Sequence, residues 1–176
     1  VEVSRIEFIQ ARDQERSDAS AVLRATMRVP KPLRGVEPID EFMAGERSMF
    51  ETEPQPKMLM RTTPDLVIPR GAHTASGLAG PVKVATEIAI FHFPLRSRRS
   101  TQARAASVGE TAASSLKPDE GFQSHYWTKM AAEDRLAEAW KAHSYADGAL
   151  DVGGRRVELI EDGRFVELIG PWVRTA

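Results

Sequence analysis

One stretch, residues 82–104 with the sequence VKVATEIAIFHFPLRSRRSTQAR, constrains the fold of this chain more than any other. β-Branched residues occupy alternate positions along its first half, as in a strand that gathers them on one face. These residues are Val82, Val84, Thr86, Ile88 and Ile90. Pro94 has no N–H for a sheet ladder, so the strand must end before it. The pattern predicts a strand over 82–91 with His92 at its C-terminal end.

A helix is expected directly after this strand, from about Arg98 to Ser114. Ser97 is well placed as its N-cap, because a serine oxygen can accept a hydrogen bond from the first turn. The N–H groups and the dipole of a helix start attract anions, and basic side chains surround this one. They are Arg96, Arg98, Arg99 and Arg104. The combination suits a phosphorylated ligand, and a solvated helix face explains the same arginines equally well.

Composition excludes several classes of function. The formal net charge of -1 provides no global field that would recruit nucleic acid. No apolar run approaches the ~20 residues that span a bilayer. The absence of cysteine excludes disulfides, thiolate zinc sites and cysteine nucleophiles, and it favours the cytoplasm. We therefore expect a cytoplasmic protein with no nucleic-acid partner and no membrane span.

The remaining patterns predict an α+β fold, in which a small mixed β-sheet is packed by about three helices. Strands are expected at the N-terminus and over 57–62, 66–68 and 82–91. Helices are expected over 38–50, 98–114 and 127–143, with a hairpin at Gly153-Gly154. Residues 165–169 are compatible with either a strand or a short helix. We expect a sheet-containing segment over 1–117, with the His-Phe-Pro-Leu-Arg-Ser junction, and a helix and hairpin tail over 118–176.

Two histidines are candidates for metal binding or proton transfer. His92 stands at a predicted strand end, although a histidine between two phenylalanines is more often packed in the interior. His73 follows Gly71 and Ala72, where a glycine permits close approach of a ligand but serves a simple turn equally well. The chain has no Asp-x-Asp, no P-loop, no Gly-x-Gly-x-x-Gly, no Gly-x-Ser-x-Gly and no His-Glu-x-x-His motif.

Four stretches in order resemble the C-terminal half of bacterial family-2-type glycosyltransferases of the GT-A fold. They are VSRIEF, PKMLMR, GAH and HFPLRS, and the resemblance covers about residues 1–109. It implies transfer of a sugar from a nucleotide-sugar donor to an acceptor, with Mn²⁺ or Mg²⁺ as cofactor. It also implies that the mixed sheet is the C-terminal part of a GT-A-type α/β fold.

The resemblance also implies roles for individual residues. In GT-A enzymes an Asp-x-Asp holds the metal on the donor diphosphate, and a histidine from the C-terminal region often completes the coordination. The resemblance thus implies His92 as the first choice of metal ligand and His73 as the second. It places Arg96 and Ser97 near the diphosphate, and the adjacent Arg98 and Arg99 are expected to bind it as well.

The sequence departs from the family because it lacks the nucleotide-binding half with its Asp-x-Asp. The chain also starts at Val1, inside an apparent strand. We therefore expect a fragment, whose missing N-terminal part lies in the same protein or in another chain. Such a fragment should not transfer sugar by itself.

Two other functions are compatible with the sequence. A non-catalytic module that docks on a partner chain predicts a self-contained sheet with an exposed apolar patch, whereas a fragment predicts an open sheet edge. A small hydrolase would use His92 with a carboxylate. It needs an acid within hydrogen-bonding reach of His92, and the sequence nominates none.

Overall fold

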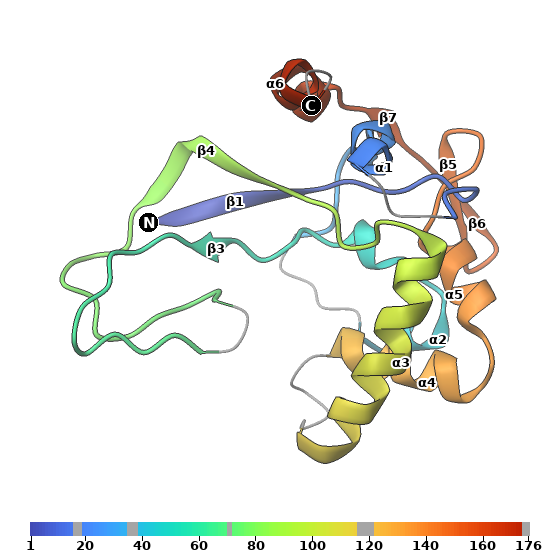
Figure 1. Cartoon of the computed structure of the whole chain (residues 1–176), viewed down its shortest axis with the longest axis horizontal. Coiled ribbons are helices and arrows are strands. Elements are labelled where there is room, and N and C mark those ends of the chain that lie inside the picture. Colours follow the sequence, from blue (N-terminus) through green and yellow to red (C-terminus); the bar gives the residue numbers. More distant parts are fainter. Residues whose placement is uncertain (16–18, 35–38, 70–71, 116–121, 174–176) are drawn as a thin grey trace. The chain divides into compact units, whose positions relative to one another are not determined.

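The structure is a computed structural model that describes residues 1–15, 19–34, 39–69, 72–115 and 122–173 (Figure 1). It combines short strands with helices, which confirms the predicted α+β class. Backbone contacts divide the chain into two compact units. Unit 1 is Val1–Glu7 with Pro54–His92, and unit 2 is Phe8–Glu53 with Phe93–Ala176. This division does not coincide with the expected boundary after residue 117, because the helices on either side of that boundary pack on each other.

Unit 1 is built on a mixed sheet, as the sequence predicts, but the strand expected over 57–62 is only two residues long. It contains β1 (Glu2–Glu7), β3 (Lys57–Met58) and β4 (Val84–His92) in the order β3-β1-β4. β1 pairs antiparallel with β3 and parallel with β4, which lies alongside it in Figure 1. The strand expected over 66–68 does not join this sheet, because there only an isolated bridge links Val67 to Ser76.

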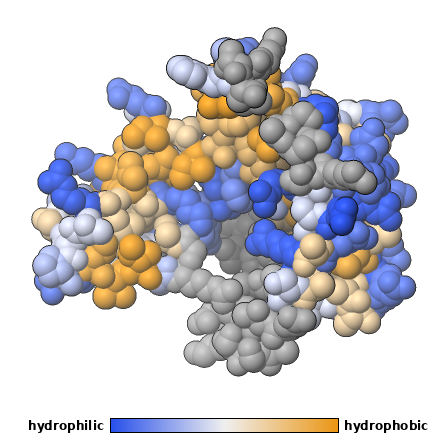
Figure 2. Space-filling view, in the orientation of Figure 1, coloured by the Kyte–Doolittle hydropathy of each residue, from blue (hydrophilic) through white to orange (hydrophobic). Residues whose placement is uncertain are grey.

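The sheet of unit 1 buries little of its apolar surface. Val3 is the only buried hydrophobic residue among the described residues of this unit. On β4 the side chains of Val84, Ile88 and Ile90 are exposed, and Val84 is 66% exposed. Figure 2 shows apolar surface along part of this strand. β4 is also an edge strand of the described sheet, although parallel sheets are normally covered on both faces.

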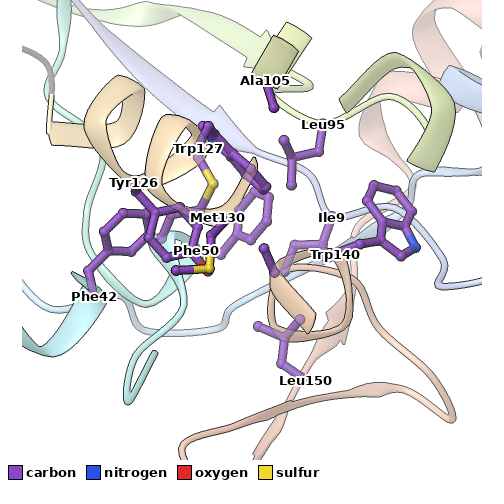
Figure 3. Packing of buried hydrophobic residues seen from close by; sticks show 12 residues of the cluster. Ile9, Phe42, Phe50, Leu95, Ala105, Tyr126, Trp127, Met130, Trp140 and Leu150 are labelled. Carbon is purple, nitrogen blue, oxygen red and sulfur yellow. The ribbon is translucent and has the colours of Figure 1, made fainter. Parts of the chain in front are cut away.

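Unit 2 holds the main hydrophobic core, to which aromatic residues from four helical elements contribute (Figure 3). Its helices are α1 (Ala19–Arg24), α2 (Ile39–Ala44), the short 3-10 helix η1 (Met49–Glu51), α3 (Arg98–Ser115), α4 (Phe122–Ala132), α5 (Leu136–Ala142) and α6 (Arg164–Val173). Its strands are β2 (Met27–Arg28), β5 (Ala149–Val152), β6 (Arg155–Glu158) and β7 (Ile160–Glu161). The described ranges thus hold six α-helices where about three were expected, and residues 165–169 belong to a helix.

The helix expected over 127–143 is two helices, α4 and α5, because a C-terminal cap interrupts it. Asp134 adopts a left-handed φ of 56°. The N–H of Arg135 donates to the carbonyl of Met130 at 2.7 Å, and that of Asp134 donates to Ala131 at 3.2 Å. These two bonds form a Schellman motif. The left-handed position of a Schellman motif is usually a glycine, but here it is Asp134. The helical pattern of the sequence therefore gives no sign that the helix is interrupted.

The helix expected over 38–50 is shorter for the same kind of reason. α2 ends before Gly45, whose φ is 77°. The N–H of Gly45 donates to the carbonyl of Phe42 at 3.0 Å. A separate turn, η1, follows with a capping box in which the backbone N–H of Ser48 donates to Glu51 at 2.8 Å. The apolar residues after Gly45 therefore reach the core through a second short element. None of the helices in the described ranges has the length and apolar character that crossing a membrane requires.

His143 lies in the centre of unit 2 and is 1% exposed. Its Nδ1 is 2.9 Å from the Ser48 hydroxyl oxygen and accepts a hydrogen bond from the Met49 N–H at 3.4 Å. The rings of Phe42, Tyr126 and Trp127 pack around it. Burial therefore lowers the pKa of His143 from 6.5 to about 3, because the apolar surroundings disfavour the charged ring.

Acid is expected to destabilise the fold through His143. The unfolded chain binds a proton near pH 6.5, whereas the folded ring stays neutral until about pH 3, so stability falls as the pH drops through that window. We expect a loss of about 2 kcal/mol from this group between pH 7.5 and 5, measured by urea unfolding at each pH. His143→Gln should lose most of this pH dependence. An unchanged slope in that variant would contradict the account.

The hairpin turn between β5 and β6 offers a matched pair of glycine substitutions. Gly153 and Gly154 both have positive φ, at 57° and 71°, but a Cβ on Gly153 would lie 2.5 Å from the carbonyl oxygen of Glu46. A Cβ on Gly154 would meet nothing within 4 Å. The free energy of unfolding should fall by about 1 kcal/mol in both alanine variants, because alanine disfavours the left-handed backbone conformation. Gly153→Ala should lose at least about 1 kcal/mol more, and equal losses in urea unfolding would disprove the close contact.

Candidate functional site

The candidate site of unit 1 lies where two parallel strands end together. β1 and β4 run in the same direction, and their last residues, Glu7 and His92, are paired in register. Ligands of sheets with parallel strands commonly bind outside the carboxyl ends of those strands. The structure therefore places His92 at the kind of edge where the sequence predicted it.

Strand register brings polar side chains to one face of this sheet. Arg5 and Glu7 of β1 share the face that Val3 occupies, because side chains alternate along a strand. Lys57 of β3 is paired with Val3, and His92 of β4 is paired with Glu7. Paired residues point to the same side, so this face carries two cations, a carboxylate and an imidazole.

Glu7 is the hydrogen-bond partner of His92 and also of Arg5. Its Oε1 lies 3.0 Å from His92 Nδ1 and 2.9 Å from Arg5 Nη2. The Glu7 side chain is 9% exposed, whereas that of His92 is 40% exposed. The other ring nitrogen of His92, Nε2, has no hydrogen-bond partner among the described residues. His92 is therefore held on one side and accessible on the other.

The acid beside His92 is the site residue that sequence analysis missed. Glu7 follows Ile6 in the first predicted strand, 85 residues before His92. The alternation of β1 assigns Glu7 to a face, but only the parallel pairing of β1 with β4 identifies its neighbour. That pairing includes a register shift between Val3 and Ser4, so counting along the two strands would not have found it.

His73, the second predicted metal ligand, uses both ring nitrogens within unit 1. Nδ1 lies 2.8 Å from the carbonyl oxygen of Pro56, and Nε2 lies 3.2 Å from Lys57 Nζ. Burial, followed by the charge of Arg5, lowers the pKa of Lys57. The described residues contain no group of three or more His, Cys, Asp or Glu side chains that could hold a metal ion. Of these two histidines, only His92 has a ring nitrogen without a hydrogen-bond partner in the described chain.

The N-terminus of α3, in unit 2, is closed by the protein itself. Ser97 is buried and its Oγ accepts the N–H of Ser100 at 3.1 Å, which confirms the predicted cap. The N–H groups of Arg98 and Arg99 donate to the carbonyls of Gln14 and Glu15 at 2.9 and 3.2 Å. The expected anion site at this helix start therefore has its first-turn amides already in use, because residues 14 and 15 cover them.

The arginine side chains around that helix start differ in how they are held. Arg98 Nη1 lies 3.4 Å from Glu15 Oε1, as an exposed ion pair. Arg96 and Arg99 are exposed, and neither has an ion pair with any residue that the structure describes. Two of the four predicted diphosphate-binding residues thus have side chains available to a ligand.

A pocket of about 430 Å³ lies elsewhere in unit 2, between α5 and the β5–β6 hairpin. It contains none of the predicted site residues. Two of its cations are already paired, because Arg155 contacts Glu51 at 3.1 Å and Arg156 contacts Glu158 at 2.9 Å. This pocket therefore has charged walls, but it has no link to the predicted chemistry.

Comparison of this chain with protein-family models, with curated proteins and with solved structures finds no match. The functional assignment thus depends on the residues of the chain and on the geometry of the two units.

Ser97→Ala tests whether Ser97 serves the helix cap. The variant should lose about 1 kcal/mol of unfolding free energy, because the Ser100 N–H loses its acceptor. Arg104→Ala, at an exposed position later in α3, is the control and should change stability by less than about 0.5 kcal/mol. Thermal or urea unfolding measures both. Equal stability of Ser97→Ala and the wild type would contradict the capping role.

Proposed function

We propose that this chain is the C-terminal portion of a nucleotide-sugar-dependent, metal-dependent glycosyltransferase. In this proposal it completes the binding of the metal and the diphosphate and shapes the acceptor side. The observation that carries the proposal is the accessible Nε2 of His92 at the common end of two parallel strands. The order of the four sequence stretches supports it independently.

His92 could supply one ligand, its Nε2, to a divalent cation. Its Nδ1 is bonded to Glu7 while Nε2 has no hydrogen-bond partner in the described chain, as in metal sites where a carboxylate hydrogen-bonds to the second nitrogen of the ligating imidazole. The remaining ligands would be diphosphate oxygens, water and groups of polypeptide outside this sequence. A bound Mn²⁺ or Mg²⁺ would neutralise charge that develops on the leaving nucleoside diphosphate.

Arginine side chains would complete the binding of the diphosphate. Arg96 and Arg99 follow His92 by four and seven residues and are exposed. Arg98 could join them, because an exposed ion pair such as that with Glu15 stabilises by only about 0–1 kcal/mol. Ser97 would contribute by holding the helix start, since its hydroxyl is already used in the cap.

The exposed edge of β4 supports the idea of an incomplete sheet. Val84, Ile88 and Ile90 are exposed along a strand that is paired on one side within the described sheet. A nucleotide-binding half with an Asp-x-Asp would supply further strands and the other metal ligands. A cytoplasmic location belongs to the same proposal and rests on the absence of cysteine.

Two other functions are each supported by one observation. The same apolar strand β4 favours a non-catalytic module that docks on a partner chain, because exposed apolar patches mark interaction surfaces. The Glu7–His92 pair supplies the acid that a small hydrolase would need for general-base catalysis. Only the glycosyltransferase proposal requires His92 to bind a cation together with a diphosphate.

Titration of Mn²⁺ with a nucleoside diphosphate tests the proposal, on this chain and on the full-length protein. We expect tight binding by the full-length protein alone, because the site is divided between its two parts. In that protein His92→Ala should weaken binding at least about tenfold through loss of a ligand. His73→Ala is the matched control and should leave binding unchanged.

Two results would contradict the proposal. One is tight, metal-dependent binding of the diphosphate by this chain alone. The other is unchanged binding by His92→Ala in the full-length protein. The open reading frame upstream should also encode an Asp-x-Asp within roughly one small domain before Val1, and a reading frame without it would exclude this family.

A further inference from the structure

We propose that Glu7, held in place by Arg5, is a positioning residue that fixes His92 as its Nδ1–H tautomer and turns the Nε2 lone pair outward. The ligand of that lone pair, a divalent cation, rests on the function proposed above. The positioning itself rests on contacts within unit 1.

The proton must lie on Nδ1 because of what Glu7 can do. An ionised carboxylate only accepts hydrogen bonds, and its Oε1 lies 3.0 Å from Nδ1. Nδ1 is therefore the donor. In the neutral ring the second nitrogen, Nε2, then carries the lone pair and can bind a metal.

Arg5 holds this carboxylate in place. Its Nη2 donates to the same Glu7 oxygen at 2.9 Å, and the two side chains are 13% and 9% exposed. A charge-assisted bond in such a sheltered position is stronger than one between neutral groups. Arg5 and Glu7 both stand on β1, and Glu7 is paired in register with His92 of β4, so backbone hydrogen bonds fix the three side chains relative to one another.

Two of the other three histidines, His73 and His143, show what the Glu7 contact adds. His73 also directs Nδ1 to an oxygen, the carbonyl of Pro56, but its Nε2 faces the Lys57 ammonium. His143 accepts the Met49 N–H at Nδ1, so its proton must lie on Nε2, and the ring is buried. Of these three, only His92 combines the Nδ1–H tautomer with an accessible Nε2.

Nitrogen-15 NMR of the histidine rings tests the tautomers directly in this chain. In the neutral rings we expect Nδ1–H for His92 and Nε2–H for His143, which serves as the internal reference. Glu7→Met removes the acceptor and should shift His92 toward the Nε2–H tautomer. Glu7→Gln restores an acceptor oxygen and should restore Nδ1–H. Glu87→Met removes an exposed carboxylate of β4 and is the control that should change nothing.

Metal binding provides the second measurement. In the full-length protein with diphosphate, Mn²⁺ should broaden the ring signals of His92, and Glu7→Met should raise the Mn²⁺ concentration needed by about 10- to 100-fold. Because Glu7→Met leaves Arg5 without its partner, Arg5→Met combined with Glu7→Met gives a variant in which neither charge is left unpaired. It should show the same shift of tautomer and the same weaker binding.

The outcomes separate this inference from the proposed function. An Nε2–H tautomer of His92 in the wild-type chain would overturn the positioning role, whether or not any variant folds. So would an Nδ1–H tautomer that persists in Glu7→Met. If the wild type shows Nδ1–H and Glu7→Met loses it, but Mn²⁺ never reaches His92 in the full-length protein with diphosphate, then the positioning role stands and the proposed function fails.

Discussion

The hydrogen bond between Glu7 and His92 is the interaction on which the functional account depends. It joins the last residues of two parallel strands that are 85 residues apart in the sequence. The bond occupies one nitrogen of the imidazole and leaves the other without a hydrogen-bond partner in the described chain, which is the nitrogen that the proposed cation would bind. Arg5 supports the carboxylate from the neighbouring position on its face. Without this bond His92 would be one more histidine beside phenylalanines, and the hypothesis of a packed residue would be preferable.

The two units differ in how they are stabilised. Unit 2 buries a cluster of aromatic and aliphatic side chains around α4 and α5, and even its polar groups, such as His143, lie inside that core. Unit 1 has a single buried hydrophobic residue among those described and exposes the β-branched side chains of β4. Burial of apolar area is the dominant favourable term in folding. The sheet of unit 1 would therefore gain stability if another polypeptide covered it. Both a missing half of the protein and a docking partner could provide that cover.

Much of the fold followed from local patterns, and the departures have local causes. Alternating β-branched residues and Pro94 predicted β4 and its end, Ser97 predicted the start of α3, and Gly153-Gly154 predicted the β5–β6 hairpin. The helix over 127–143 was predicted wrongly as one element, because Asp134 takes a left-handed conformation that its residue type does not announce. For the site, sequence identified His92 but not Glu7, since parallel pairing across a register shift is a tertiary property. It also could not show that residues 14 and 15 close the helix start that the arginines surround.

The most direct test of the central claim is a crystal structure of the full-length protein with Mn²⁺ and a nucleoside diphosphate, using the anomalous signal of manganese to locate the ion. The account predicts one manganese peak on the diphosphate, within coordination distance of His92 Nε2, while His92 Nδ1 remains bonded to Glu7. A manganese peak on the diphosphate with His92 turned away from it, or with Glu7 itself as the ligand in place of His92, would contradict the account.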